Sequence, residues 1–200
     1  MAENKDKDIV MKCRHMEKVY PGTKALDDVD FNIYRGKVNV LIGENGAGKS
    51  TLMKQIAGIE QPSSGKMYLD GEEVSFKNTT EARAKGVGII HQELSLFPNL
   101  NVYQNIFMNN EQKKGVVVNN EIHKQKTKEV LERLEYPIDP EAKVGDLRVG
   151  QQQMIEIAKA LSINAKILIM DEPTSALTSR EIDELFNIIR KLKSQGCGIV

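Results

Sequence analysis

A glycine-rich stretch near the start of the chain has the residue types and spacing of a phosphate-binding loop. It begins at Gly43, ends at Lys49, Ser50 and Thr51, and satisfies the pattern G-x-x-x-x-G-K-[ST] at every position. Glycines let the backbone turn its N–H groups toward phosphate oxygens, the lysine reaches the β- and γ-phosphates, and the serine hydroxyl ligates Mg²⁺. The stretch predicts a nucleoside triphosphate site with the members Gly43, Glu44, Asn45, Gly46, Ala47, Gly48, Lys49, Ser50 and Thr51.

The residues on both sides of this loop favour the same interpretation. Residues 38–42 are almost entirely apolar and predict a buried strand that enters the loop. Apolar residues at helical spacing follow the loop, and Gly58 is a typical stop signal for the helix that they predict. The alternative is an ordinary glycine-rich turn. The apolar helical positions are Leu52, Met53, Ile56 and Ala57.

A second group of reactive side chains follows an apolar segment late in the chain. Residues 167–170 predict a buried strand, and Asp171 and Glu172 come directly after it. Carboxylates at the C-terminal end of a parallel strand face the crevice where α/β sheets bind ligands. We expect Asp171 to hold Mg²⁺ through its water shell and Glu172 to deprotonate the water that attacks the γ-phosphate. The alternative is a solvated strand end.

Composition narrows the class of protein. The 200 residues suit one domain, or one domain with a small insertion, and equal numbers of basic and acidic side chains (28 each) disfavour a nucleic-acid partner. Cys13 and Cys197 form no C-x-x-C pair, so we expect buried free thiols. No apolar run approaches the ~20 residues that cross a bilayer, and residues 1–8 predict a charged, flexible tail.

The rest of the chain predicts an α/β fold with two additions. Short strands expected at residues 9–20, 30–34, 66–69 and 73–76 form an antiparallel layer, and residues 87–90 are a further apolar run. A polar, helical insertion is expected at about residues 93–149, where Asn120 could cap a helix whose apolar face contains Thr127, Val130, Leu131 and Leu134. Core-like patterns then resume with helices at residues 151–162 and 181–193, and with a strand at residues 197–200.

These motifs occur in an order that resembles the nucleotide-binding domain of ABC transporters, together with Gln92, residues 147–153 and the turn at Ser175, Ala176 and Leu177. Residues 88–100, 149–161 and 169–178 resemble the first ATPase domain of bacterial monosaccharide importers. The resemblance implies a P-loop NTPase core of three layers with a mostly parallel sheet, an N-terminal antiparallel subdomain and an inserted helical subdomain. It also implies that residues 9–200 form one such domain, with ATP and Mg²⁺ as ligands.

The resemblance assigns further roles. Gln92 would sense the γ-phosphate through the metal and the attacking water, and would complete a metal-binding set with Ser50 and Asp171. Lys49, Gln92 and Glu172 would form the catalytic set. Tyr20 would stack on adenine, although an aromatic residue at a strand end is often part of the core. A surface glutamine is the alternative for Gln92, and His15 and His91 are interpreted as structural.

The signature loop that the resemblance implies would act on the nucleotide of a second ATPase domain. Its residues are Leu147, Arg148, Val149, Gly150 and Gln151. The wider family usually has a serine and a glycine where this chain has Arg148 and Val149, and an acid where it has Thr178. Arg148 could pair with a phosphate or turn toward solvent.

The family also has a switch histidine a few residues after the last strand, and this chain ends at Val200 without it. His15, His91 and His123 lie upstream and cannot replace it by sequence order. We therefore expect a C-terminally truncated domain from a longer protein with two ATPase domains in tandem.

Three functions remain open at this point. The first is an ATPase that drives monosaccharide import from the cytoplasmic face of the bacterial membrane, with a second ATPase domain, an integral permease and, indirectly, a sugar-binding protein as partners. The second is a non-transport ABC ATPase that acts on ribosomes or DNA, against which the balanced charge argues. The third is an ATP-binding interaction module with little turnover.

An apolar cluster after Gln92 is the predicted contact with the permease. It consists of Phe97, Pro98, Leu100 and Val102, which we expect to be exposed. The alternative is that these residues pack inside the helical insertion.

Overall fold

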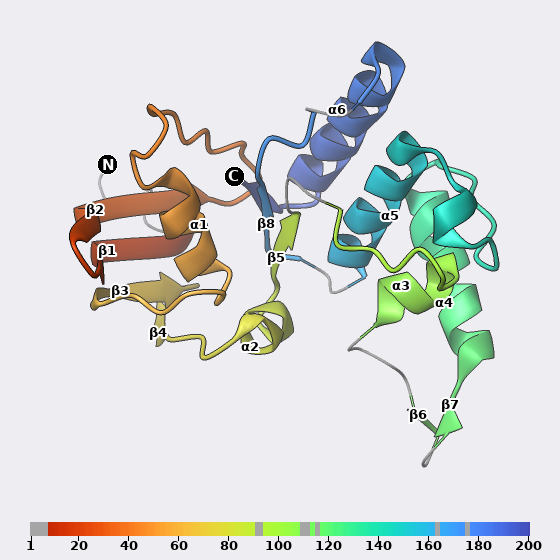
Figure 1. Cartoon of the computed structure of the whole chain (residues 1–200), viewed down its shortest axis with the longest axis horizontal. Coiled ribbons are helices and arrows are strands. Elements are labelled where there is room, and N and C mark those ends of the chain that lie inside the picture. Colours follow the sequence, from red (N-terminus) through yellow and green to blue (C-terminus); the bar gives the residue numbers. More distant parts are fainter. Residues whose placement is uncertain (1–7, 91–93, 109–112, 115–116, 163–164, 175–176) are drawn as a thin grey trace. The chain divides into compact units, whose positions relative to one another are not determined.

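The computed structural model of the chain describes residues 8–90, 94–108, 113–114, 117–162, 165–174 and 177–200 (Figure 1). The chain folds into two compact units. Unit 1 contains residues 1–89, 165–171 and 189–200, and unit 2 contains residues 90–164 and 172–188.

An antiparallel sheet of four strands forms the first part of unit 1, as the sequence predicts. Its spatial order is β2-β1-β3-β4. Cys13 on β1 lies opposite Phe31 on β2 and Met67 on β3. The predicted strand at residues 30–34 is longer than expected, because the hairpin turns tightly at Gly22 and pairing starts at once. The strands are β1 (Ile9–Tyr20), β2 (Thr23–Tyr34), β3 (Ser64–Leu69) and β4 (Glu72–Val74).

Two helices complete this part of unit 1. The predicted helix after the glycine-rich loop is present as α1 (Lys49–Ile56), whose buried residues include Leu52 and Ile56. They belong to one apolar core with residues of β1 and β3 such as Met11 and Met67. A further helix, α2 (Thr79–Ala84), was not predicted from periodicity because it is too short to show a stripe.

A second sheet in the structure has the order β5-β8-β9. The strands are β5 (Val87–Ile90), β8 (Ile167–Met170) and β9 (Gly198–Ile199). β8 has the predicted bounds, and β8 and β9 run parallel, with Ile167 opposite Gly198. β8 ends at Met170, so Asp171 follows directly at the C-terminal end of a parallel strand, as expected.

The strand predicted at residues 38–42 is absent, and this prediction was wrong. Val38 forms only an isolated bridge with Ile199, and the Asn39 N–H donates to the Ile199 carbonyl at 2.6 Å. Val40 and Ile42 are 68% and 87% exposed. β9 has only two residues, and the ladder stops after Asn39. Leu41 still packs against the core of unit 1, whereas Val40 and Ile42 remain exposed.

Helices dominate unit 2. The predicted face of α4 is buried at Thr127, Val130, Leu131 and Leu134, but the helix is capped by Asn119 rather than Asn120. The Asn119 carboxamide oxygen accepts from the Ile122 N–H at 3.2 Å. The elements are α3 (Val102–Phe107), β6 (Lys113–Lys114), β7 (Val117–Val118), α4 (Asn120–Arg133), the 3-10 helix η1 (Val144–Asp146) and α5 (Val149–Leu161).

The last helix, α6 (Ser179–Ser194), begins in unit 2 and ends in unit 1. It starts two residues earlier than predicted because Thr178 and Glu181 form a capping box. α5 likewise begins at Val149, two residues before its predicted start. In both cases the apolar pattern locates the packed turns but not the first residues of the helix.

Candidate functional site

The glycine-rich loop predicted to bind phosphates turns sharply before α1. Gly46 and Gly48 have φ values of 83° and 85°, in the left-handed region that favours glycine. A Cβ atom on Gly48 would lie 2.4 Å from the Ala25 carbonyl oxygen on β2, so the loop can approach the sheet this closely only with glycine. Gly48 is also the N-cap of α1, and its carbonyl accepts from the Leu52 N–H at 2.9 Å. The loop therefore leads directly into a helix N-terminus, which favours anions.

The Lys49 side chain folds back over the loop. Its ammonium group donates to the carbonyl oxygens of Gly43 at 2.6 Å and Glu44 at 2.8 Å. The charge is thus held within the loop rather than extended into solvent, beside the exposed Ser50 in the first turn of α1. Phosphate oxygens could replace these neutral carbonyls as stronger, charge-assisted partners. The Lys49 ammonium suits the phosphate oxygens of a triphosphate, and the exposed Ser50 hydroxyl suits its Mg²⁺.

The two carboxylates after β8 lie in different environments. Asp171 is half-buried in unit 1, whereas Glu172 is exposed. Glu172 has a φ of 45°, in the left-handed region where a side chain other than glycine is strained. Strained backbone of this kind is concentrated at catalytic positions.

Tyr20 lies at the end of β1 with its hydroxyl held by polar partners. The hydroxyl donates to the Glu60 carboxylate, and the Lys18 ammonium lies 5.2 Å from the centre of the ring. The hydrogen bond to Glu60 raises the pKa of Tyr20, with burial and the charge of Glu60 acting in the same direction and a hydrogen bond from Thr51 opposing them. The ring is half-buried and is not part of the core of unit 1.

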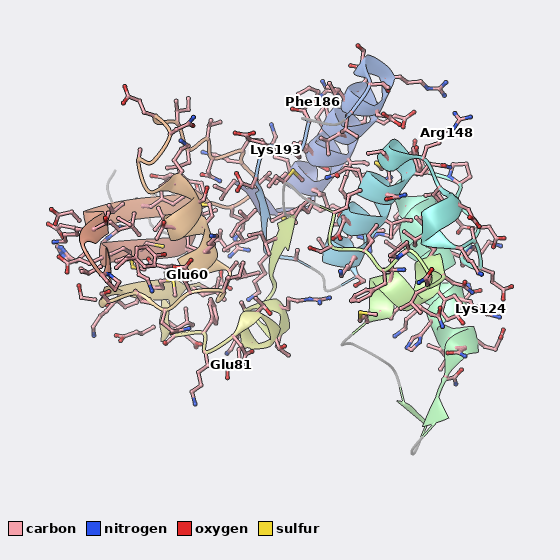
Figure 2. All side chains as sticks on the ribbon, in the orientation of Figure 1. Glu60, Glu81, Lys124, Arg148, Phe186 and Lys193 are labelled. Atoms are coloured by element: carbon pink, nitrogen blue, oxygen red, sulfur yellow. The ribbon has the colours of Figure 1, made fainter. Side chains whose placement is uncertain are left out.

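The proposed signature loop forms the start of α5 in unit 2. Arg148 is exposed and lies at the edge of the unit (Figure 2), and Val149 is 49% exposed. The Arg148 backbone N–H donates to the Gln151 side-chain oxygen at 3.1 Å. Gln152 donates to the Leu147 carbonyl at 2.9 Å. Side-chain amides of α5 therefore hold the loop in place at the head of the helix.

Gly150 faces the carboxylate of Glu181, a contact that motif reading did not identify. A Cβ atom on Gly150 would lie 1.6 Å from Oε1 of Glu181, while Oε2 accepts from the Thr178 backbone N–H at 2.9 Å and its hydroxyl at 2.8 Å. The Glu181 carboxylate therefore caps the N-terminus of α6 and lies close to the first turn of α5. These residues and Arg148 line a cavity of about 860 Å³. The T-x-x-E spacing of Thr178 and Glu181 is the sequence signal that could have indicated the cap.

Several predicted site residues lie outside the described part of the chain. These are Gln92, Ser175 and Ala176, and His91 also belongs to this group. Leu177 is described, and its N–H donates to the Thr174 carbonyl at 3.2 Å.

The segment that follows Gln92 is anchored by polar side chains of α5. The Ser95 N–H donates to the Glu156 carboxylate at 2.9 Å, and the Lys159 ammonium donates to the Ser95 carbonyl at 3.2 Å. Glu156 is buried, which is unusual for a carboxylate without such partners. It was missed because helical spacing places it away from the apolar stripe of Met154, Ile157 and Leu161, where a charged side chain is expected to face solvent.

The apolar cluster after Gln92 is only partly exposed. Phe97 is 52% exposed and Pro98 is exposed, but Leu100 is half-buried and Val102 is fully buried, so the prediction for Val102 was wrong. Val102 is buried because it belongs to the packed face of α3. The Asn105 side chain donates to the carbonyls of Phe97 and Leu100 at 3.1 and 3.3 Å and holds the preceding loop on α3.

The described histidines and cysteines form no metal centre. Among the residues that the structure describes, no three His, Cys, Asp or Glu side chains gather to hold an ion. His15 bonds Asp28 at 2.7 Å, and this hydrogen bond raises the pKa of the imidazole. Cys13 and Cys197 are buried free thiols, as predicted, and burial raises their pKa values to about 12 and about 11.

The fold and the two motif groups define a P-loop protein of the ABC type, and comparison with known families agrees. The ABC transporter family matches residues 26–175, and the chain belongs to this family. A nucleotide-free ATP-binding cassette superimposes with a TM-score of 0.84 at 26% identity, covering 96% of this chain and 79% of that one. A dimeric cassette bound to ADP and phosphate gives a TM-score of 0.78 at 27% identity, covering 95% and 86%.

Similar curated proteins are sugar import subunits. The galactose/methyl galactoside import ATP-binding protein of Salmonella typhimurium is 49% identical over 96% of this chain, and the ribose import ATP-binding protein of Rubrobacter xylanophilus is 46% identical over 96%. The chain spans 38% of the length of each of these relatives. Within the described residues, no helix combines the length and the apolar character needed to cross a bilayer.

Proposed function

We propose that this chain binds and hydrolyses ATP and thereby powers the import of a monosaccharide. The observation that carries the proposal is the phosphate loop, in which Gly48 opens α1 and the Lys49 ammonium is held over the loop carbonyls. The similarity of the chain to galactose and ribose import subunits supports a monosaccharide as the substrate class.

In this proposal one domain supplies most of the nucleotide site. Tyr20 stacks on the adenine ring, the N–H groups of residues 43–51 hold the phosphates, and Lys49 neutralises the β- and γ-phosphates. Ser50, Asp171 and Gln92 hold Mg²⁺, which when bound neutralises charge on the phosphate oxygens.

Glu172 is the proposed general base. Its carboxylate accepts a proton from the attacking water, whose oxygen bonds to the γ-phosphorus as the bond to the β–γ bridging oxygen breaks. The products are ADP and phosphate, and Lys49 and Gln92 stabilise the charge that spreads over the transferred group.

The signature loop is proposed to act on a second nucleotide. Residues 147–151 would approach the γ-phosphate bound by another ATPase domain, with the turn of residues 175–177 next to that contact. Backbone N–H groups at the start of α5 suit an anion, and the exposed Arg148 adds a cation there. Glu181 would have to move away from Gly150 for a phosphate to reach it.

The partners follow from the same proposal. A second ATPase domain completes the site, an integral permease receives the motion, and a sugar-binding protein delivers the sugar to the permease. The chain would then work at the cytoplasmic face of the bacterial membrane as a peripheral subunit. Residues 9–200 would form its nucleotide-binding domain, with a helical subdomain at about residues 93–149, and residues 1–8 would form a tail. Phe97 and Pro98 are the exposed remainder of the proposed permease contact.

A binding titration with Lys49→Ala tests the central step. Calorimetric titration with Mg-ATP should show binding to the protein and a loss of at least tenfold in affinity for the variant, because a charge-assisted phosphate contact is removed. The matched control is Lys66→Ala, which removes an exposed lysine that pairs with Glu73 at 2.9 Å on the antiparallel sheet. Equal affinities of Lys49→Ala and the unaltered protein would reject the assignment of the loop.

A further inference from the structure

Glu60 stands at the point where the phosphate-loop helix ends, and its backbone is fixed there. The N–H groups of Ile59 and Glu60 donate to the Lys54 carbonyl at 2.8 and 3.3 Å, and Gly58 supplies the left-handed turn with a φ of 71°. The carboxylate thus follows a hydrogen-bonded helix end in unit 1, where Figure 2 labels Glu60 beside α1. Motif reading gave this residue no role.

Two lysines from different elements surround the Glu60 carboxylate. Lys18 on β1 and Lys54 on α1 each approach one of its oxygens at 3.7 Å. The side chains of Glu60 and Lys18 are only 22% and 17% exposed, so this charge is partly shielded from solvent. The lysines hold the carboxylate in place by ion pairing, and a carboxylate is a strong acceptor for a hydroxyl group.

The Tyr20 ring is restrained from several sides by these groups. Its hydroxyl donates to Glu60 and interacts with the side chain of Thr51, the last residue of the phosphate-loop pattern. Lys18 covers one face of the ring, with its ammonium 5.2 Å from the ring centre. Stacking of the adenine, as proposed above, would therefore use the opposite face of the ring.

We propose that Glu60 is a positioning residue for the base of the nucleotide. It holds the Tyr20 ring in the orientation in which the ring stacks on adenine, and it ties that ring to α1, the helix that begins at the phosphate loop. Ordering the ring before binding reduces the entropy that binding has to offset. The inference rests on the proposed stacking of Tyr20.

The test compares a ligand that has a base with one that does not. Calorimetric titrations with Mg-ATP and with Mg-tripolyphosphate separate the base contribution from the phosphate contribution. Glu60→Ala should weaken ATP binding roughly two- to tenfold and leave tripolyphosphate binding unchanged, because only the ring is released. Glu60→Gln keeps a hydrogen-bond acceptor and should recover part of the loss. The matched control, Glu73→Ala, removes an exposed glutamate on β4 and should change neither affinity.

A double variant links Glu60 to the ring itself. Tyr20→Ala should weaken ATP binding more than Glu60→Ala does, and Glu60→Ala should have no further effect when Tyr20 is already alanine. Circular dichroism of each variant reports whether the fold is retained, and Glu60→Gln provides the measurement if Glu60→Ala does not fold.

The outcomes separate this inference from the proposed function. If Tyr20→Ala weakens ATP binding and both Glu60 variants leave it unchanged, the role of Glu60 is rejected and the proposed function stands. Equal losses for ATP and tripolyphosphate in Glu60→Ala mean that Glu60 only supports the fold, which also overturns the inference. If the unaltered protein binds neither ligand, both proposals fail.

Discussion

Single residues determine whether the proposed site can do chemistry, and Glu172 is the clearest case. It combines a carboxylate, an exposed position after β8 and a left-handed backbone. Glu172→Gln keeps the size and shape of the side chain but removes the base, so nucleotide binding should persist while hydrolysis slows by about 10²–10⁴. Phosphate release by the complete transporter at saturating ATP measures this, and near-normal turnover would reject the role.

Gly48 permits a backbone approach that no other residue allows. Gly46 and Gly48 share a positive φ, but only at Gly48 would a Cβ atom meet the Ala25 carbonyl. Gly46→Ala should therefore cost about 1–2 kcal/mol of unfolding free energy for the backbone conformation. Gly48→Ala should cost a further ~1–3 kcal/mol for overpacking. Urea unfolding of both variants measures the difference, and equal losses would show that the close approach to β2 does not matter.

At the scale of elements, the turn between β3 and β4 is fastened to other parts of unit 1. The Asp70 carboxylate pairs with Arg35 and accepts from the Lys166 ammonium at 2.6 Å. Burial acts to raise the pKa of Asp70, but the hydrogen bonds and charges of Lys166 and Arg35 together lower it below its ordinary value. Because the folded-state pKa is depressed, this carboxylate stabilises the fold above the pKa of the unfolded state, about 3.9, and the stabilisation disappears as the pH falls through the folded-state value.

Asp70→Asn tests this link. The variant should be less stable than the unaltered protein at pH 7, and the difference should shrink as the pH falls below about 4. Urea unfolding at several pH values measures it. Glu73→Gln, which breaks an ion pair in which both side chains are more than half exposed, should have a smaller effect. A pH-independent difference for Asp70→Asn would show that the charge of Asp70 is not what holds the turn.

Elements of the fold were predictable to different degrees. β8 has its predicted bounds because an apolar segment before two carboxylates leaves little choice of register. Residues 38–42 have the same apolar character, yet Val40 and Ile42 are exposed, since a strand also needs a partner of sufficient length and β9 pairs only as far as Asn39.

At the scale of the whole molecule, the proposal requires two ATPase domains for one cycle. The phosphate loop of residues 43–51 and the signature loop of residues 147–151 are single segments in the proposal, and there they act on different nucleotides. The isolated chain should therefore bind Mg-ATP and hydrolyse it well below the roughly 1–10³ s⁻¹ of typical enzymes. Turnover per molecule should rise with protein concentration, because a second copy must supply the signature loop.

Phosphate release measured over a range of protein concentrations, with binding measured in parallel, checks this prediction. Rapid turnover that does not depend on concentration would mean that one copy contains the whole catalytic unit. Binding without any turnover at high concentration would favour a nucleotide-dependent interaction module.

The sequence by itself determined the structural features that depend on residues close together in the chain. The phosphate loop, the carboxylates after β8 and the buried faces of α4 and α5 follow from spacing over a few residues, because local backbone geometry sets which side chains share a face or a turn. Only the tertiary structure decided the contacts between distant segments. Glu60 reaches Tyr20, and Glu181 reaches Gly150, across long stretches of chain. Such contacts depend on how strands and helices pack, and no local pattern of residue types encodes that packing.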